Sequence, residues 1–234
     1  MADYQLEQEI LAEAGRPGGL VFGVDEAGRG PWAGPVTAAA CWLHPDYISA
    51  LDKGLTDSKQ LSPKQRRYFE EQIMGGPHRF AVAHASVEEI DRLGILKATF
   101  LAMQRAVDQL AAELSSALSS ALSSELAAEI AGLPSAILVD GNLTPPFDNI
   151  GTALIRPVVK GDSKSLSIAA ASVCAKECRD RAMMALDRDY PAYGFAAHKG
   201  YGTKQHQEAL TQFGPCPAHR TSFKPVARLI QNEA

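Results

Sequence analysis

Two short apolar segments of this chain end abruptly in carboxylates. Residues 20–25 run into Asp25 and Glu26, and residues 136–139 run into Asp140. Short apolar runs followed by glycine are typical of strands buried in a sheet with helices on both faces. A charge at the end of such a strand has to lie at an edge of the sheet, where the sites of α/β proteins collect. The pattern therefore predicts an acidic site at the strand ends.

Helical patterns alternate with the strand patterns along the chain. Ser62-Pro63-Lys64-Gln65 predicts a capped helix start, and a second Ser-x-x-Glu box begins at Ser86. Strands interleaved with helices predict an α/β or α+β fold with a mixed sheet. The expected strands are 20–25, 36–43, 80–85, 136–140 and 153–159; the expected helices are 4–14, 63–74, 86–94, a longer one from residue 95, 165–189, and two short ones after residues 202 and 221.

Size and composition indicate an ordinary globular protein. The 234 residues can bury a substantial core, and 46% hydrophobic against 21% charged residues is an average balance. No apolar run approaches the length of a membrane span. The acidic first residues lack the basic and then apolar pattern of a secretory signal. We therefore expect a cytoplasmic protein, a monomer, without membrane association.

The four cysteines are too scattered for a disulfide framework. Cys174 and Cys178 stand four residues apart, so a zinc pair is conceivable. Because no second pair lies nearby, small buried apolar residues are the more usual interpretation.

The C-terminal quarter of the chain is basic, although the whole carries a net charge of −4. A local basic region suggests an anionic partner, and a solvated surface explains the charge about equally well. Between residues 195 and 230 the basic residues are Lys199, Lys204, Arg220, Lys224 and Arg228, against the single acid Glu208.

Residues 111–133 contain a short repeat, Leu-Ser-Ser-Ala, with Leu or Ile recurring every four residues. At 100° per residue such a stripe winds around a helix instead of holding one face. We expect a helical extension or a surface excursion, and no catalytic element.

Asp25, Glu26, Asp140 and Asp162 are the candidate metal ligands, because Mg²⁺ and Mn²⁺ prefer carboxylates and water. Adjacent strand residues point to opposite faces, so Asp25 and Glu26 can share a site only if regular structure stops at Asp25. Each acid also has an ordinary alternative. Asp140 with Gly141 makes an acceptable turn, and Asp162 could cap the following helix.

Two glycine-flanked loops are candidate binding elements. In Gly28-Arg29-Gly30 the backbone can approach a ligand closely, and its N–H groups can point at oxygen atoms. The alternative is a tight turn between strands. Tyr201, between two glycines, could be a platform for a sugar or base or a packed loop residue. Lys59 precedes a capped helix and could simply be solvated.

Six blocks together resemble the type 2 ribonucleases H, the ribonuclease HII family, in sequence and in order. The resemblance covers about residues 20 to 228, and the combination is highly specific although no single block is. The blocks are GVDEAGRGPWAGPV (23–36), DSKQLSPKQR (57–66), LVDGN (138–142), VVKGDSKSLSIAAASVCAK (158–176), YGFAAHKGYGT (193–203) and HRTSFKPV (219–226).

The resemblance implies an RNase H-like α/β fold, a mixed five-stranded sheet flanked by helices, with a helical C-terminal part. It implies a lead-in at 1–19, a catalytic domain at 20–213 with an insertion near 111–133, and a C-terminal helical segment at 214–234. The implied activity is cleavage of the RNA strand of RNA–DNA hybrids and incision 5′ to ribonucleotides embedded in duplex DNA. The implied products carry 3′-hydroxyl and 5′-phosphate ends.

The resemblance also implies roles for individual residues. Asp25, Glu26, Asp140 and Asp162 match the family's catalytic acids, which bind Mg²⁺ or Mn²⁺; two such ions about 4 Å apart can activate water and stabilise the departing oxygen. The implied substrate contacts are Gly28, Arg29 and Gly30 at the 2′-hydroxyl of the RNA–DNA junction, Tyr201 on the adjoining deoxyribose, and Lys59 near the nucleic-acid backbone.

Two alternatives remain open at this stage. A type 3 ribonuclease H would share the fold with a different junction preference, but the intact Gly-Arg-Gly and Lys-Gly-Tyr blocks argue against it. A nucleic-acid-binding module with structural acids is the other, and the presence of all four acids weighs against it. Nothing in the sequence decides whether the chain docks on a replication clamp.

Overall fold

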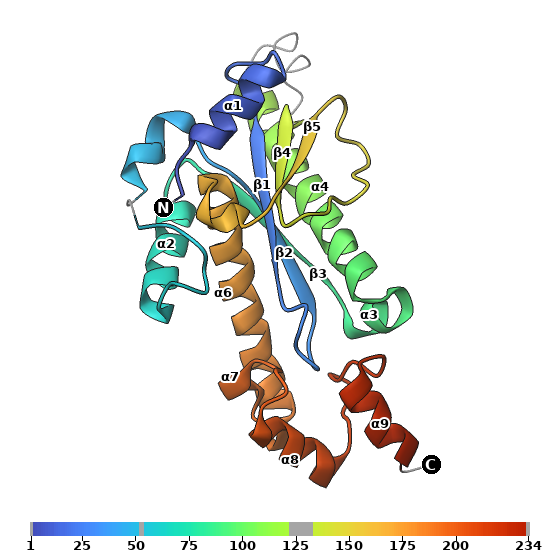
Figure 1. Ribbon diagram of the computed structural model, residues 1–234. Helices are drawn as coiled ribbons and strands as arrows, with labels where there is room; N and C mark the ends of the chain where they lie inside the picture. Colours follow the sequence, from blue (N-terminus) through green and yellow to red (C-terminus); the bar gives the residue numbers. More distant parts are fainter. Residues whose placement is uncertain (1, 52–53, 122–132, 233–234) are drawn as a thin grey trace.

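The computed structural model describes residues 2–51, 54–121 and 133–232. At its centre lies a mixed sheet of five strands in the order β3-β2-β1-β4-β5 (Figure 1). Strands β1, β2 and β3 pair antiparallel, whereas β1, β4 and β5 pair parallel. The predicted mixed five-stranded α/β fold is confirmed. The strands are β1 (Val21–Ala27), β2 (Val36–Trp42), β3 (Arg79–Ala85), β4 (Ala136–Asp140) and β5 (Leu154–Val158).

From the sequence we expected strand β1 to end at Asp25, but it continues to Ala27. Its parallel pairing with β4 stops at Val24, but its antiparallel pairing with β2 continues through Glu26 and Ala27. The expectation was wrong because the hairpin partner β2 supplies backbone hydrogen-bond partners beyond the point where β4 ends.

The helices follow the predicted signals closely. Ser62 and Ser86 each accept a hydrogen bond from the N–H three residues on, and Gln65 and Glu89 complete both capping boxes. Ser165 caps α6. The α-helices are α1 (Gln5–Glu13), α2 (Pro63–Gly75), α3 (Val87–Leu93), α4 (Ile95–Ala121), α6 (Leu166–Asp189), α7 (Phe195–His198), α8 (Lys204–Phe213) and α9 (Lys224–Asn232), and 3-10 turns span Pro45–Ala50, Gly161–Ser163 and Pro191–Tyr193.

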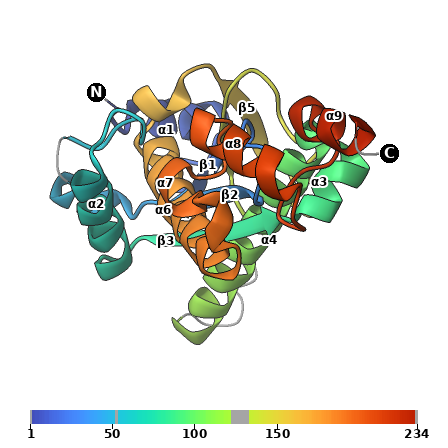
Figure 2. The same cartoon turned by 90° about the horizontal axis from the view of Figure 1, so that it is seen from below.

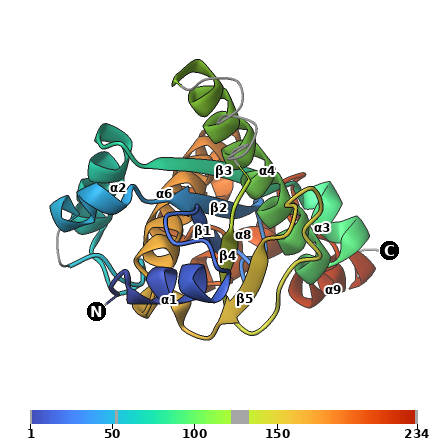
Figure 3. The same ribbon diagram turned by 90° about the horizontal axis from the view of Figure 1, so that it is seen from above.

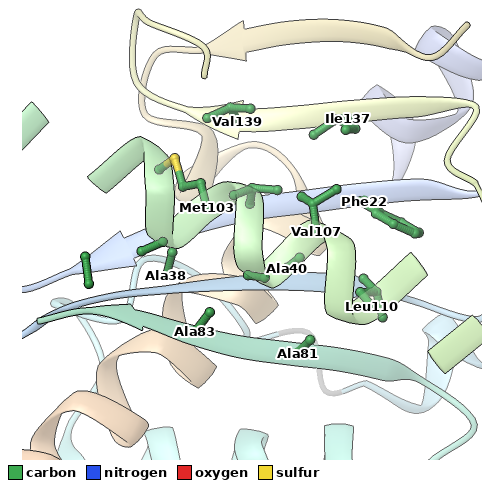
Figure 4. Packing of buried hydrophobic residues seen from close by; sticks show 14 of the residues in the cluster. Phe22, Ala38, Ala40, Ala81, Ala83, Met103, Val107, Leu110, Ile137 and Val139 are labelled. Atoms are coloured by element: carbon green, nitrogen blue, oxygen red, sulfur yellow. The ribbon is translucent and has the colours of Figure 1, made fainter. Parts of the chain in front are cut away.

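Helices lie on both faces of the sheet (Figure 3), and each face has its own hydrophobic core. Helix α4 covers one face, and its Met103, Val107 and Leu110 point at the strands (Figure 4). Helices α6 and α2 cover the other face through alanine-rich contacts. The sheet residues beneath α4 in Figure 4 include Phe22, Ala38, Ala40, Ala81, Ala83, Ile137 and Val139.

Helix α1 fixes the start of α6. Ile10 and Leu11 pack against β1 and β4. The buried carboxylate of Glu7 accepts hydrogen bonds from the hydroxyls of Ser165 and Ser167 and from the Ser167 N–H. Helix α6 is thereby held at one defined position beside the end of β5.

The C-terminal helices pack at the far end of α6, next to the β1–β2 hairpin (Figure 2). Ala33 of the hairpin and Met183 of α6 share a hydrophobic cluster with Phe195, Leu210 and Val226. This cluster spans the boundary expected at residue 213, and the division there stays a prediction.

The first part of the Leu-Ser-Ser repeat continues α4 as a helix to Ala121, so a helical extension is confirmed for that part. The remainder of the predicted insertion, residues 122–132, lies outside the described residues. Among the described helices, none has both the length and the apolar character needed to cross a bilayer.

Gly23 marks the closest approach between β1 and α6, which gives a first prediction. A Cβ at Gly23 would lie 2.2 Å from the Ser167 carbonyl carbon and 2.4 Å from the Ile168 nitrogen. Because both are backbone atoms of a packed helix, Gly23→Ala should lower the free energy of unfolding by about 1–3 kcal/mol. Urea unfolding measures this.

Gly75, at the end of α2, is the matched control, since a Cβ there meets nothing within 4 Å. Gly75→Ala should be neutral or slightly stabilising. Equal stability of Gly23→Ala and the unchanged protein would show that α6 does not pack on β1 as described.

Candidate active site

Three carboxylates meet at the ends of neighbouring strands. Asp25 lies on β1, Asp140 is the last residue of β4, and Asp162 lies in the 3-10 turn after β5. One oxygen of each lies within 4.8 Å of the others. Asp25 and Asp162 are almost completely buried. Because β1, β4 and β5 run parallel, their carboxyl ends open at the same edge of the sheet.

A local hydrogen bond holds Asp140 in place. The Gly161 N–H donates to Oδ1 of Asp140 at 2.6 Å, which joins the end of β4 to the turn that carries Asp162. Ser165, not Asp162, caps α6, so the alternative of Asp162 as the helix cap is wrong.

Glu26 lies beside this cluster and is not among the three acids grouped by distance. Its backbone N–H donates to Oδ1 of Asp25 at 2.6 Å, and its carboxylate pairs with Arg29 at 3.3 Å. The regular pairing of β1 through Glu26 explains this, because successive side chains on a strand diverge. The negative charge of Asp140 nevertheless reaches Glu26 and contributes to raising its pKa, after burial as the larger cause.

The acids repel one another in a buried setting. Burial, followed by the charges of Glu26 and Asp140, raises the pKa of Asp25 well above its usual value. Burial, followed by Asp140 and Asp57, raises the pKa of Asp162 to about 6. A divalent cation would relieve this repulsion, and carboxylate oxygens are the ligands that Mg²⁺ and Mn²⁺ prefer. The donor set therefore fits the metal predicted from the sequence.

Lys59 lies between two pockets. Burial alone would lower its pKa, but the charges of Asp25, Asp57 and Asp162 together raise it. Lys59 lines both the 330 Å³ pocket that holds Asp140 and Asp162 and a neighbouring 260 Å³ pocket beside Glu26. It joins the acids to the second pocket.

The loop that carries Lys59 is tied to α6. The Ser172 hydroxyl donates to the Ser58 hydroxyl at 2.9 Å. Arg66 donates to the Ser58 carbonyl at 3.4 Å and to Glu177 at 2.6 Å. These bonds hold the backbone next to Lys59 in place, close to the acids.

The second pocket brings the two predicted glycine loops together. Gly28 has a φ of +97°, and a Cβ there would lie 1.9 Å from Nε of Arg179, so packing as well as ligand approach requires glycine. A Cβ at Gly30 would lie 3.7 Å from the Tyr201 ring. The pocket is lined by Glu26, Ala27, Gly28, Arg29, Gly30, Ser58, Lys59, Lys176, Arg179 and Tyr201.

Tyr201 has a half-exposed side chain on a firmly held backbone. Its carbonyl accepts a hydrogen bond from Nδ1 of His206 at 3.0 Å, and Nε2 of His206 lies 3.0 Å from Nε2 of His219. Both histidines are buried. The exposed ring at the pocket is the arrangement that a stacking platform needs.

Several supporting residues of the site were not predicted from the sequence. Ser172 lies beside Asp25 and opposes the rise in the pKa of that acid. Lys176 lines the second pocket. Arg179 and Arg220 are buried. The charge of Arg220 had suggested that it belongs to a basic surface, but its burial shows that it does not. Ser172, Lys176 and Arg220 stand within the matched blocks, but nothing in a linear pattern distinguishes a supporting residue from a neighbour.

The cysteines do not form a metal site in the described ranges. Cys174 is buried with its Sγ 4.0 Å from that of Cys41. Neither Cys174 nor Cys178 belongs to a group of three described residues with ligand atoms close enough for a metal. Cys174 has the packing role expected of a buried thiol.

The sequence of this chain is similar to those of known ribonucleases HII. The family model described as ribonuclease HII matches residues 22–226. A ribonuclease HII of Hyphomonas neptunium is 48% identical over 212 residues, which cover 91% of this chain and 97% of that protein. A ribonuclease HII of Coxiella burnetii is 46% identical, with coverage of 90% and 91%.

A solved structure gives the same result. The crystal structure of the ribonuclease H2 from Pyrococcus horikoshii OT3 is similar with a TM-score of 0.63 and 26% sequence identity, covering 91% of this chain and 98% of that one. The extent of these matches means that this chain belongs to the ribonuclease HII family, metal-dependent endonucleases that hydrolyse the RNA of RNA–DNA hybrids.

Proposed function

We propose that this ribonuclease HII incises duplex DNA on the 5′ side of an embedded ribonucleotide, leaving 3′-hydroxyl and 5′-phosphate ends. The observation that carries the proposal is the joining of two pockets through Lys59, one holding Asp140 and Asp162 and the other holding the Gly28–Gly30 loop. A phosphodiester at the acids then places the neighbouring sugar at the glycine loop.

Asp25, Asp140 and Asp162 would hold the metal, with Glu26 as the fourth acid beside this cluster. The mutual repulsion of these buried acids supports this assignment. When bound, Mg²⁺ or Mn²⁺ supplies activation of water and stabilisation of the leaving oxygen. The ion is Mg²⁺ or Mn²⁺, since the carboxylate set suits either of them.

The chain's own residues orient the substrate. The raised pKa of Lys59 keeps its ammonium charged beside the acids, where it attracts a phosphate oxygen. Gly28, Arg29 and Gly30 present backbone N–H groups to the 2′-hydroxyl, the group that separates RNA from DNA. The exposed ring of Tyr201 stacks on the adjoining deoxyribose.

We propose a cytoplasmic location for this activity. The cysteines in the described ranges are free thiols, as expected in a reducing compartment.

Asp25→Asn tests the role of the acids. The variant should still bind an RNA–DNA hybrid, because the second pocket is unchanged, but Mg²⁺-dependent cleavage should fall on the order of 10³-fold. Gel-based cleavage and fluorescence-anisotropy binding measure the two effects. Asp46→Asn, an acid on the 3-10 turn Pro45–Ala50, is the control with unchanged activity. Wild-type cleavage by Asp25→Asn would contradict the assignment.

We also expect Asp25→Asn to change the thermal stability of the metal-free protein. Removing one of the repelling charges should raise the metal-free melting temperature by about 2–4 °C, equivalent to about 1 kcal/mol. Adding Mg²⁺ should raise the melting temperature of the unchanged protein and not that of Asp25→Asn. Calorimetry with and without EDTA checks this; an equal Mg²⁺ effect in both proteins would place the metal elsewhere.

Tyr201→Ala tests the junction contact. Loss of a stacking ring, worth about 1–3 kcal/mol, should reduce incision at a single embedded ribonucleotide about tenfold or more. Tyr47→Ala is the matched control, because its side chain is equally half-exposed but lies outside both pockets. An unchanged rate for Tyr201→Ala on the embedded-ribonucleotide duplex would remove Tyr201 from the site.

A further inference from the structure

Arg220 is a fully buried residue whose side chain contacts the hairpin loop from behind. Its Nη2 donates to the Gly28 carbonyl at 2.7 Å, its Nη1 to the Arg29 carbonyl at 3.0 Å and its Nε to the Gly34 carbonyl at 2.9 Å. All three nitrogens of one planar guanidinium therefore donate hydrogen bonds to carbonyls of a single loop. This geometry suits arginine and not lysine, whose ammonium is a compact point donor.

Arg179 completes the support. It is also buried, and it donates to the carbonyls of Pro35 at 3.2 Å, Ala33 at 3.3 Å and Lys199 at 3.1 Å. Arg179 thus joins the hairpin loop to the loop that carries Tyr201. Neither Arg179 nor Arg220 forms an ion pair with a carboxylate of the described residues.

The direction of these bonds fixes the direction of two backbone donors. In a trans peptide the C=O and the following N–H point to opposite sides, and the described chain has no cis peptide bonds. Because the carbonyls of Gly28 and Arg29 point at Arg220, the N–H groups of Arg29 and Gly30 point away from it. Among the hydrogen bonds of the described residues, neither N–H has an acceptor within the protein. Both residues line the second pocket.

The charge behind the loop has a second effect. Burial and then the neighbouring Arg179 lower the pKa of Arg220 to about 9, which leaves the guanidinium charged at neutral pH. A buried cation that withdraws electron density from two peptide carbonyls strengthens the N–H donors of the same peptide groups, since hydrogen bonds in a chain polarise one another.

We propose that Arg220 is a positioning residue for substrate selection: its guanidinium turns the N–H groups of Arg29 and Gly30 into the pocket, where they read the 2′-hydroxyl of the substrate. This proposal rests on the proposed function, because it assigns the cause of the ribonucleotide selectivity assumed there. It places the origin of selectivity near the C-terminal end of the chain, about 190 residues from the loop it controls.

Arg220→Lys and Arg220→Gln test the proposal together. Lysine keeps the charge without the three-sided geometry, and glutamine loses both. Both variants should lose on the order of 10²-fold in kcat/KM on a duplex with one ribonucleotide, the cost of misplacing a contact by about 1 Å. Their Mg²⁺ affinity, measured by calorimetry, should be unchanged, because Arg220 does not contact the acids.

Thr221→Ala is the matched control. Thr221 is the next residue, and its hydroxyl donates to Asp91 of α3 instead of the hairpin loop. This variant should keep wild-type selectivity. Wild-type kcat/KM for a folded Arg220→Lys would overturn the proposal, as would a loss in Thr221→Ala as large as that in Arg220→Lys, since either result would show that the guanidinium geometry is not what matters.

A measurement on the unchanged protein covers the case in which the Arg220 variants do not fold. By amide hydrogen exchange in EDTA, the N–H groups of Arg29 and Gly30 should exchange rapidly in the free protein. They should become protected by a duplex with one ribonucleotide and not by the all-DNA duplex. Protection of both amides in the free protein would overturn the proposal, while rapid exchange without incision activity would contradict the proposed function alone.

Discussion

The parallel pairing of β1 with β4 is the constraint on which the site depends. It places Asp25 one residue beyond the last paired position and Asp140 at the end of the next strand. Both charges are thereby forced to one edge of the sheet, and the turn after β5 adds Asp162. The resulting repulsion opposes folding of the metal-free protein and favours cation binding. Much of the remaining structure holds this edge in place.

The close approach of α6 serves the same edge. Gly23 allows the helix to contact β1 backbone to backbone, and Ser172 of α6 then reaches both Asp25 and the Ser58 loop. Further along the helix, α6 supplies Arg179 to the hairpin loop. One helix therefore sets the distance between the acids and the hairpin loop that we propose selects the substrate.

Much of the fold and of the acidic site could be predicted from the sequence, because the signals are local. Strand β4 was predicted to the residue and the start of α6 to within one residue, since an apolar run ending in Asp140 and a long run of small helix-forming residues are short-range patterns. The end of β1 could not be predicted in this way. Its extension through Glu26 depends on pairing with β2, and that tertiary contact overrode the breaking signal of the glycines.

Arg220 shows why the supporting residues escaped prediction. Its charge, counted along the chain, indicated a basic surface, whereas its side chain is buried against Gly28 and Arg29. Linear charge patterns carry no information on contacts between residues almost 200 positions apart. The same holds for His206, which donates to the Tyr201 carbonyl, and for His219, whose Nε2 lies against that of His206. Both contacts appear only after the C-terminal helices have packed.

We propose that catalysis and sugar selection share one site, and this can be tested by mapping the cleavage products of one substrate. The substrate is a DNA duplex with a single ribonucleotide, cut in Mg²⁺ and separately in Mn²⁺. With either metal ion we expect one incision on the 5′ side of the ribonucleotide. The upstream fragment should carry a 3′-hydroxyl and the ribonucleotide a 5′-phosphate. Cutting only within long RNA–DNA hybrids, or incision on the 3′ side, would contradict it.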